Sequence, residues 1–125
     1  MVVMDSSAWL AVFDGKPGVE KAVANEELIT PSIALAEVVK ILRKRGKTIE
    51  NIEAIVSKMR TESVILPLDK ANAVPAGLFV FETQLDFVDG IIYSYASQEH
   101  KVVTCDSAFK DKPLAIYIDI HELKK

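Results

Sequence analysis

Cysteine and histidine are scarce in this chain, which has one cysteine and two histidines among its 125 residues. A single cysteine, Cys105, excludes an intrachain disulfide and any zinc site built from several thiolates. The histidines, His100 and His121, lack the spacing of a zinc motif or of a catalytic triad. The carboxylates are therefore the main candidates for chemistry.

Long hydrophobic runs are also missing. No apolar stretch approaches the ~20 residues of a membrane span, and residues 1–5 lack the basic region and apolar core of a signal peptide. The chain has no glycine-rich phosphate loop and no dinucleotide-binding fingerprint. Half of its residues are hydrophobic, which is enough for one globular domain over residues 1–125. A cytoplasmic location is the simplest expectation.

Positive charge is not in excess, because 15 basic residues face 18 acidic ones and the net charge is −3. This balance excludes a bulk electrostatic attraction to nucleic acid. The basic residues are nevertheless concentrated in one short segment, which contains Lys40, Arg43, Lys44, Arg45 and Lys47. The first four are candidate contacts for a phosphate backbone, although basic residues also suit the C-terminal end of a helix.

Short apolar runs alternate with segments of helical periodicity along the chain. Strands are predicted at residues 2–4, 28–30, 64–66, 102–105 and 115–118. Helices are predicted at residues 6–13, 19–24, 31–45, 49–60, 69–82 and 86–100, with a kink or a split at Pro75. The alternation indicates an α/β fold with a mainly parallel sheet and right-handed crossovers.

Two acids directly follow apolar runs that are predicted to be strands. Asp5 closes the first strand and Asp106 closes the fourth. Open α/β sheets bind ligands beyond the C-terminal ends of their strands, near the point where strand order reverses. If the two strands are neighbours, these carboxylates emerge side by side. Ser7 and Thr104 are candidates for orienting them or a water molecule, or for local turn bonds.

Two further acids lie on or beside the apolar stripes of predicted helices. Asp89 is in line with Val88 and Ile92, and Glu37 borders the stripe of its own helix. A buried, unpaired carboxylate must be neutralised, pair with a base or bind a metal. Neither the first strand nor the helix around Asp89 contains a lysine or arginine. Four converging carboxylates would suit a hard divalent cation such as Mg²⁺ or Mn²⁺.

Each acid also has a structural alternative. Asp5 and Asp106 are both placed to cap a following helix. Asp86 and Asp89 resemble a capping box, and we interpret Asp86 as its structural cap. Glu37 taken alone is typical of a solvated position. The combination of four acids in these places favours a functional site.

Four short motifs give the chain a family resemblance. They are Val3-Met4-Asp5-Ser6-Ser7, Ala36-Glu37-Val38, Phe87-Val88-Asp89-Gly90-Ile91-Ile92 and Val103-Thr104-Cys105-Asp106-Ser107-Ala108-Phe109. In order and spacing they resemble PIN-domain proteins, and most closely the small VapC-type toxins of prokaryotic toxin–antitoxin pairs. Two positions depart from the pattern: Gly90 stands where alanine is usual, and Cys105 stands where a polar or basic residue is frequent.

The resemblance implies a PIN fold, a parallel five-stranded sheet in the order 3-2-1-4-5 flanked by helices. It implies that Mg²⁺ or Mn²⁺ is held by an acidic quartet formed by Asp5, Glu37, Asp89 and Asp106, and that Ser7 is the family's frequent hydroxyl beside the first acid. It also implies metal-dependent hydrolysis of RNA, a homodimer and a small antitoxin partner. The basic segment would then contact the RNA backbone.

Other functional classes remain open from the sequence. A signalling receiver domain would use Asp69 as phosphoacceptor, together with Thr104 and Lys112. Against it, Asp5 has no acidic neighbour and Lys112 precedes the last predicted strand. A PIN-like scaffold without catalysis, or a PIN nuclease that processes RNA without an antitoxin, is the further alternative.

Overall fold

The computed structural model describes residues 1–120, so His121 and the end of the expected domain lie outside the described part. The strands are β1 (Val2–Met4), β2 (Leu28–Pro31), β3 (Ser63–Leu66), β4 (Val102–Thr104) and β5 (Ala115–Tyr117). The helices are α1 (Ser6–Phe13), α2 (Pro17–Val23), α3 (Ser32–Lys44), α4 (Ile49–Glu62), α5 (Lys70–Thr83) and α6 (Phe87–Tyr93), with a short 3-10 helix η1 (Ser107–Phe109). These bounds agree with the predicted elements to within a few residues, except for α6.

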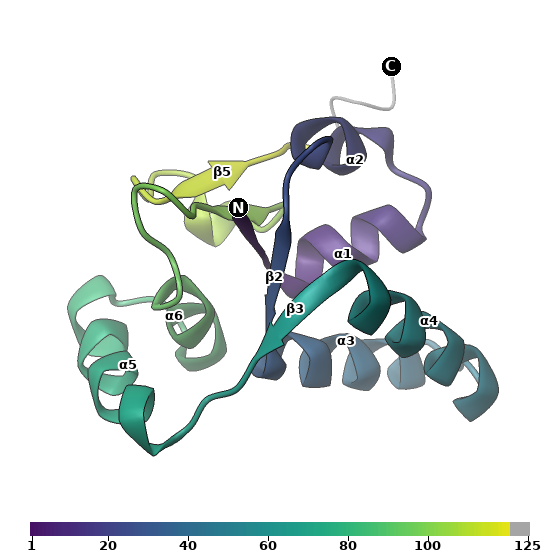
Figure 1. The fold of residues 1–125 in the computed structure, drawn as a ribbon, viewed down its shortest axis with the longest axis horizontal. Coiled ribbons are helices and arrows are strands. Elements are labelled where there is room, and N and C mark those ends of the chain that lie inside the picture. The colour runs from purple at the N-terminus through teal and green to yellow at the C-terminus, as the bar shows by residue number, and fades with distance from the viewer. Residues whose placement is uncertain (121–125) are drawn as a thin grey trace.

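The five strands form one parallel sheet in the order β3-β2-β1-β4-β5 (Figure 1), which confirms the predicted topology. The central strand β1 pairs with β2 through Val3 opposite Ile29, and with β4 through Met4 opposite Val103. The order of strands therefore reverses at β1. Because β1 and β4 are parallel neighbours, their C-terminal ends lie at the same edge of the sheet, immediately before Asp5 and Asp106.

Helices cover both faces of the sheet, and successive residues of β1 enter opposite cores. Met4 packs in a core built largely from α1 to α4, which includes the fully buried Trp9. Val3 packs in a second core with Ile92 of α6 and Phe109 of η1. A strand buried on both faces needs a continuous apolar run rather than an alternating one, which is what β1 has. Helix α5 lies outermost, with α6 between it and the sheet (Figure 1).

Helix α6 ends at Tyr93, so the prediction that it continues to residue 100 was wrong. Its end is fixed by serines that bond to nearby backbone. Ser94 Oγ donates to the carbonyl of Ile91 at 2.5 Å. Ser97 and His100 then exchange two backbone hydrogen bonds, which close a tight turn before β4. Serine side chains compete for backbone bonds in this way and favour turns over a helix interior.

Helix α5 is capped as predicted but is not split. Asp69 accepts hydrogen bonds from the backbone N–H groups of Ala71 and Asn72, and the Asn72 side chain bonds back to Asp69. The helix continues across Pro75, so the expected split does not occur. Proline has no backbone N–H, so the carbonyl of Ala71 lacks its usual helical hydrogen bond. Because Pro75 and Ala71 are both exposed, water can bond to this carbonyl instead. Within the described residues, every helix is too short or too polar to span a membrane.

Gly90 is required by the close contact between α6 and α5. A Cβ at residue 90 would lie 2.7 Å from Val80 Cγ2 and 3.1 Å from Val80 Cα. Rotation of the valine side chain cannot relieve the second contact, since Cα belongs to the backbone of α5. The glycine that departs from the PIN-like pattern therefore has a packing reason.

Replacing Gly90 with alanine is expected to destabilise the fold by about 1–3 kcal/mol, because overpacking outweighs the ~1 kcal/mol that alanine gains in helix propensity. Gly77→Ala is the matched control in α5, since a Cβ there meets nothing within 4 Å. We expect that control to be at least as stable as the parent. Urea unfolding measures both effects, and a Gly90→Ala variant as stable as the parent would contradict the packing argument.

Candidate functional site

Asp5 is the most deeply buried acid of the site, with 1% of its surface exposed at the end of β1. Its Oδ2 accepts hydrogen bonds from Ser7 Oγ at 2.6 Å and from Thr104 Oγ1 at 2.8 Å. Its side chain makes no capping bond to α1, so the capping alternative was wrong. Burial raises the pKa of Asp5; the hydroxyl bonds lower it, and the charge of Glu37 adds to the rise.

The two hydroxyls that hold Asp5 also join β1 to β4. Ser7 Oγ and Thr104 Oγ1 lie 3.1 Å apart. Ser7 Oγ accepts from the backbone N–H of Cys105 at 2.9 Å, and Thr104 Oγ1 accepts from that of Asp106 at 3.0 Å. Both predicted supporting residues therefore contact the first acid and position the segment that carries the last one.

Asp106 has a structural role as well as a place beside this network. Its Oδ1 accepts a 2.9 Å hydrogen bond from the backbone N–H of Ala108, so it caps η1 as the alternative proposed. A carboxylate carries two oxygens with several acceptor positions. Capping through Oδ1 is therefore compatible with a ligand at the other oxygen.

Glu37 of α3 is held toward the cluster by Ser6, a residue that the sequence did not predict to belong to the site. Ser6 Oγ donates a short hydrogen bond to Glu37 Oε1 and lies 3.5 Å from Asp5 Oδ1. Ser6 is buried in the first turn of α1. Its place directly after Asp5 was the only signal, because the contact with Glu37 depends on how α3 packs against α1.

Asp89 is half-buried on α6, and its pKa is raised to about 7. Partial burial is the largest cause, followed by the charges of Asp5, Asp106, Glu37 and Asp86. All four acids expected to form the site therefore lie close enough to interact electrostatically. Their segments, the end of β1, α3, α6 and the end of β4, are far apart in sequence.

Asp86 was assigned the wrong role from the sequence. It occupies the residue before α6, but its side chain makes no capping hydrogen bond. Its charge instead contributes to the raised pKa of Asp89. It is a fifth acid at the border of the cluster, and the capping-box pattern concealed it.

The donor set of this cluster suits a hard cation. Carboxylate and hydroxyl oxygens are the ligands that Mg²⁺ and Mn²⁺ prefer, and among residues 1–120 no ion pair involves any of the four acids. The side chains of this part of the chain do not already form a compact group of three or more metal-binding residues. Burial raises the pKa of neighbouring Cys105 to about 11, with a contribution from Asp5, so its thiol remains protonated.

The basic segment divides into residues near to and far from the acids. Lys40 lines a hollow of about 210 Å³ between α3 and α6, together with Glu37 and Val88. Arg45 instead pairs with Asp14 at 3.2 Å, and Arg43 donates to the backbone carbonyl of Lys47. Lys44 is exposed at the end of α3, two turns beyond Glu37. Only Lys40 of the four predicted contacts adjoins the cluster.

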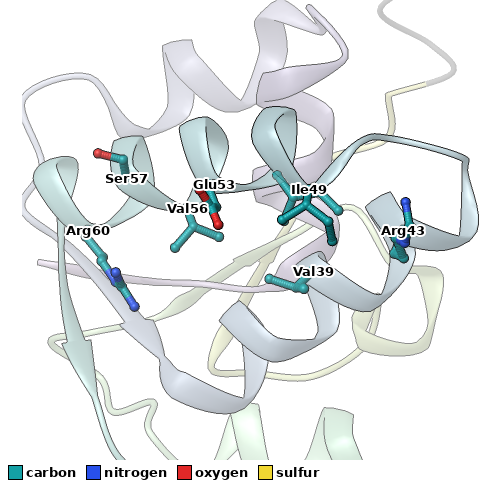
Figure 2. A pocket seen from close by; sticks show the side chains of 8 residues that line it. Val39, Arg43, Ile49, Glu53, Val56, Ser57 and Arg60 are labelled. Atoms are coloured by element: carbon teal, nitrogen blue, oxygen red, sulfur yellow. The ribbon is translucent and has the colours of Figure 1, made fainter.

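A large hollow elsewhere on the surface contains none of the four acids. It has a volume of about 650 Å³ and lies between α3 and α4 (Figure 2). Val39, Ile49, Ile52 and Val56 supply apolar side chains to it, and charged residues lie among them, including Arg43, Glu53 and Arg60. It is a second, separate feature of the surface.

A family model described as the PIN domain matches residues 2–114. The chain belongs to the PIN domain family. No curated protein matches the sequence. The structure is similar to a toxin–antitoxin complex from Klebsiella pneumoniae, with a TM-score of 0.72 and 17% identity over 93% of this chain and 96% of that one.

Two other PIN-like structures share the fold. One is VapBC2 from Rickettsia felis bound to a promoter DNA fragment, with a TM-score of 0.71 and 18% identity over 94% of this chain and 98% of that one. The other is VapC20 from Mycobacterium tuberculosis, described as a Sarcin-Ricin loop cleaving toxin, with a TM-score of 0.64 and 15% identity over 98% of this chain and 94% of that one. At such identities the likeness establishes the fold alone.

The receiver-domain alternative loses its support, since Asp69, which it would need as phosphoacceptor, caps α5.

The raised pKa of Asp89 predicts a pH-dependent stability of the metal-free PIN domain. In the native state the pKa of Asp89 is about 7, so the side chain keeps its proton up to that pH, whereas an aspartate side chain free in water loses its proton near pH 3.8. The native state thus binds more protons in this interval, and the free energy of unfolding falls as pH rises through it. Asp89→Asn should remove this loss and be more stable than the parent at pH 8 by about 1–2 kcal/mol, a value reduced for partial exposure.

Urea unfolding in EDTA at pH 5 and pH 8 measures this difference. Asp14→Asn, on an exposed acid outside the cluster, serves as the control and should show no such pH-dependent gain. If the free energy of unfolding of Asp89→Asn equals that of the parent at both pH values, the pKa of Asp89 is not raised in the native state.

Proposed function

We propose that this PIN domain is a Mg²⁺- or Mn²⁺-dependent ribonuclease whose acids are Asp5, Glu37, Asp89 and Asp106. The observation that carries the proposal is the convergence of these four carboxylates from separate segments: partial burial first, and then the charges of Asp5, Asp106 and Glu37, raise the pKa of Asp89. Among residues 1–120 no ion pair involves any of the four. Mutual repulsion of this kind disfavours the empty, fully charged site and favours a bound cation.

The residues of the chain divide the chemical work. A divalent ion bound among the acids would supply an activated water and stabilise charge on the leaving oxygen. Asp5 and Asp106, at the ends of neighbouring strands, would provide rigid oxygen ligands for this ion, and Asp89 would add a third from α6. Glu37 serves as a ligand, directly or through water, or as the base that accepts a proton from the attacking water.

Lys40 is the favoured contact for the RNA backbone. Lys40 and Glu37 line the same hollow between α3 and α6. A phosphate bound by the acids and their cation would therefore lie within reach of the Lys40 side chain. Arg43 and Arg45 are engaged with Lys47 and Asp14, which leaves them less suited to this role. An RNA substrate also agrees with the cytoplasmic location that the sequence favours.

We further propose that the nuclease is the toxin of a type II pair and acts as a homodimer inhibited by a small antitoxin. Support comes from two structural neighbours, one described as a toxin–antitoxin complex and the other as VapBC2. The hollow between α3 and α4 is lined by apolar side chains, by Arg43 and Arg60, and by the acid Glu53 (Figure 2). Its basic residues outnumber its acids, so it suits an apolar segment that carries acidic residues. An RNA-processing nuclease without antitoxin is the second candidate. Growth arrest on expression, relieved by the product of an adjacent gene, would favour the toxin.

Cleavage of labelled RNA with Mg²⁺ or Mn²⁺ tests the nuclease proposal. We expect the parent to cleave, EDTA to abolish cleavage, and Asp5→Asn to lower the rate by about 100-fold or more, because it replaces a ligand held by two hydroxyls. A metal-loaded, folded parent that cleaves no RNA in a panel of structured and single-stranded substrates would contradict the proposal.

Matched substitutions separate the site from general surface effects. Asp14→Asn should leave cleavage unchanged, since Asp14 pairs only with Arg45 among the ion pairs of residues 1–120. Lys40→Ala should weaken RNA binding and lower the slope of log affinity against log salt by roughly 0.7, as expected for one lost phosphate contact on a single strand. Lys44→Ala, one turn further from the acids, should change both less. Equal effects of the two lysines would remove Lys40 from the site.

A further inference from the structure

The hollow between α3 and α6 combines an apolar wall with two charged side chains. It has a volume of about 210 Å³ and is lined by Ile33, Ala36, Glu37, Lys40 and Val88. Ile33 and Val88 pack against the second core, so they form the inner wall of the hollow. Ala36 and Lys40 are exposed. The small side chain of Ala36 leaves the apolar wall open to a ligand from solution.

Two features connect this hollow to the acidic cluster. Glu37 belongs to both, and Val88 directly precedes Asp89 in α6. Along α3, Ile33, Glu37 and Lys40 are four and three residues apart, which places them on one side of the helix. A ligand in the hollow would therefore contact the acidic site through Glu37 and meet a lysine one helical turn away.

We propose that this hollow binds one unpaired nucleobase of the RNA, from a nucleotide next to the phosphate that is held at the acids. The inference rests on the proposed nuclease function and gives that site a subsite for its substrate. A nucleotide is divided in the same way as the hollow, since its base has apolar faces and its phosphate is anionic. The base would lie against Ile33, Ala36 and Val88, and the phosphate would lie toward Lys40 and the cation.

The size and the charges of the hollow favour a base over other occupants. Sites for drug-sized ligands enclose ~300–1,000 Å³, so a hollow of about 210 Å³ suits one planar ring system and is too small for a helix of a protein partner. An acidic side chain of a partner would be repelled by Glu37, and a basic one by Lys40. A nucleotide avoids both, because its base is neutral and its phosphate lies between Lys40 and the cation.

A subsite of this kind selects for an unpaired base rather than for a particular base. A paired base is stacked within its helix, so it reaches the wall of the hollow only after it leaves the stack. The apolar side chains of the wall offer no hydrogen bonds to base edges, and Lys40 and Glu37 are assigned to the phosphate and the cation. Apolar contacts discriminate weakly between ligands of similar shape.

Methyl NMR spectra of the full chain test the subsite directly. The probe is a single-stranded RNA hexamer, and Ca²⁺, which takes the same oxygen ligands, replaces Mg²⁺ to slow cleavage. We expect the methyl signals of Ile33, Ala36 and Val88 to shift with this hexamer. They should not shift with a hexamer of abasic ribose phosphates or with a duplex of the same sequence. The methyl signals of Val64, exposed on β3, are the internal control and should stay in place throughout.

Filling the hollow tests the fit of the base. Ala36→Leu should weaken binding of the single-stranded hexamer by at least about 10-fold, the scale of one lost base contact. It should leave the weaker binding of the abasic hexamer unchanged. Ala54→Leu places the same side chain at an exposed position of α4 and is the matched control, which should change neither affinity. A melting curve establishes that each variant is folded.

Four results would overturn the subsite. They are the absence of RNA binding, equal methyl shifts with the abasic hexamer, an equal loss of both affinities in Ala36→Leu, and shifts produced by N-acetyl-leucinamide but not by RNA. The last would assign the hollow to an apolar side chain of a protein partner. Hexamers of adenosine, uridine and cytidine whose affinities differ by more than about 100-fold would overturn the weak discrimination between bases.

Binding and cleavage can fail separately. All of these measurements report binding, whereas metal-dependent cleavage of labelled RNA reports on catalysis. A chain that places a base in the hollow but cleaves no RNA would keep the subsite and lose the nuclease proposal. A chain that cleaves RNA without shifting the three methyl signals would keep the nuclease proposal and lose the subsite.

Discussion

The burial of one carboxylate constrains the rest of the structure. Asp5 is 1% exposed, and a charged group in that position is costly unless hydrogen bonds and nearby cations compensate for lost hydration. Ser7 and Thr104 provide part of that compensation by donating to one oxygen. Because the same hydroxyls accept bonds from Cys105 and Asp106, the need to hold this carboxylate also fixes the end of β4 against the end of β1.

The other acids add charge repulsion to the region around Asp5. Asp89 and Glu37 approach from helices on separate crossovers, and the charges of both Asp5 and Asp106 raise the pKa of Asp89. This repulsion lowers the stability of the metal-free domain and is the reason that we propose a cation as the ligand of this site. The reversal of strand order at β1 is the structural device that brings these segments together.

The helices divide the surface into regions with different chemistry. Glu37 of the acidic cluster lines a hollow between α3 and α6, the large hollow lies between α3 and α4, and α5 exposes the apolar side chains of Val74, Leu78 and Phe81. Gly90 links the first and last of these, because the close approach of α5 to α6 depends on its missing side chain. A change in how α5 packs on α6 would therefore move both the exposed apolar side chains of α5 and the helix that carries Asp89.

The sequence by itself determined the α/β class and the short buried strands, because continuous apolar runs and helical periodicity are local patterns. Together with the family resemblance, it also led to the strand order and to four acids that the structure brings within electrostatic reach of one another. Only the tertiary structure placed Ser6 against Glu37, gave Asp86 a role other than capping, and separated Lys40 from Arg43 and Arg45. These depend on contacts between segments far apart in the chain, and local patterns carry no information on which side chains will meet after packing. The early end of α6 was likewise decided by serine bonds within a turn that helical periodicity does not register.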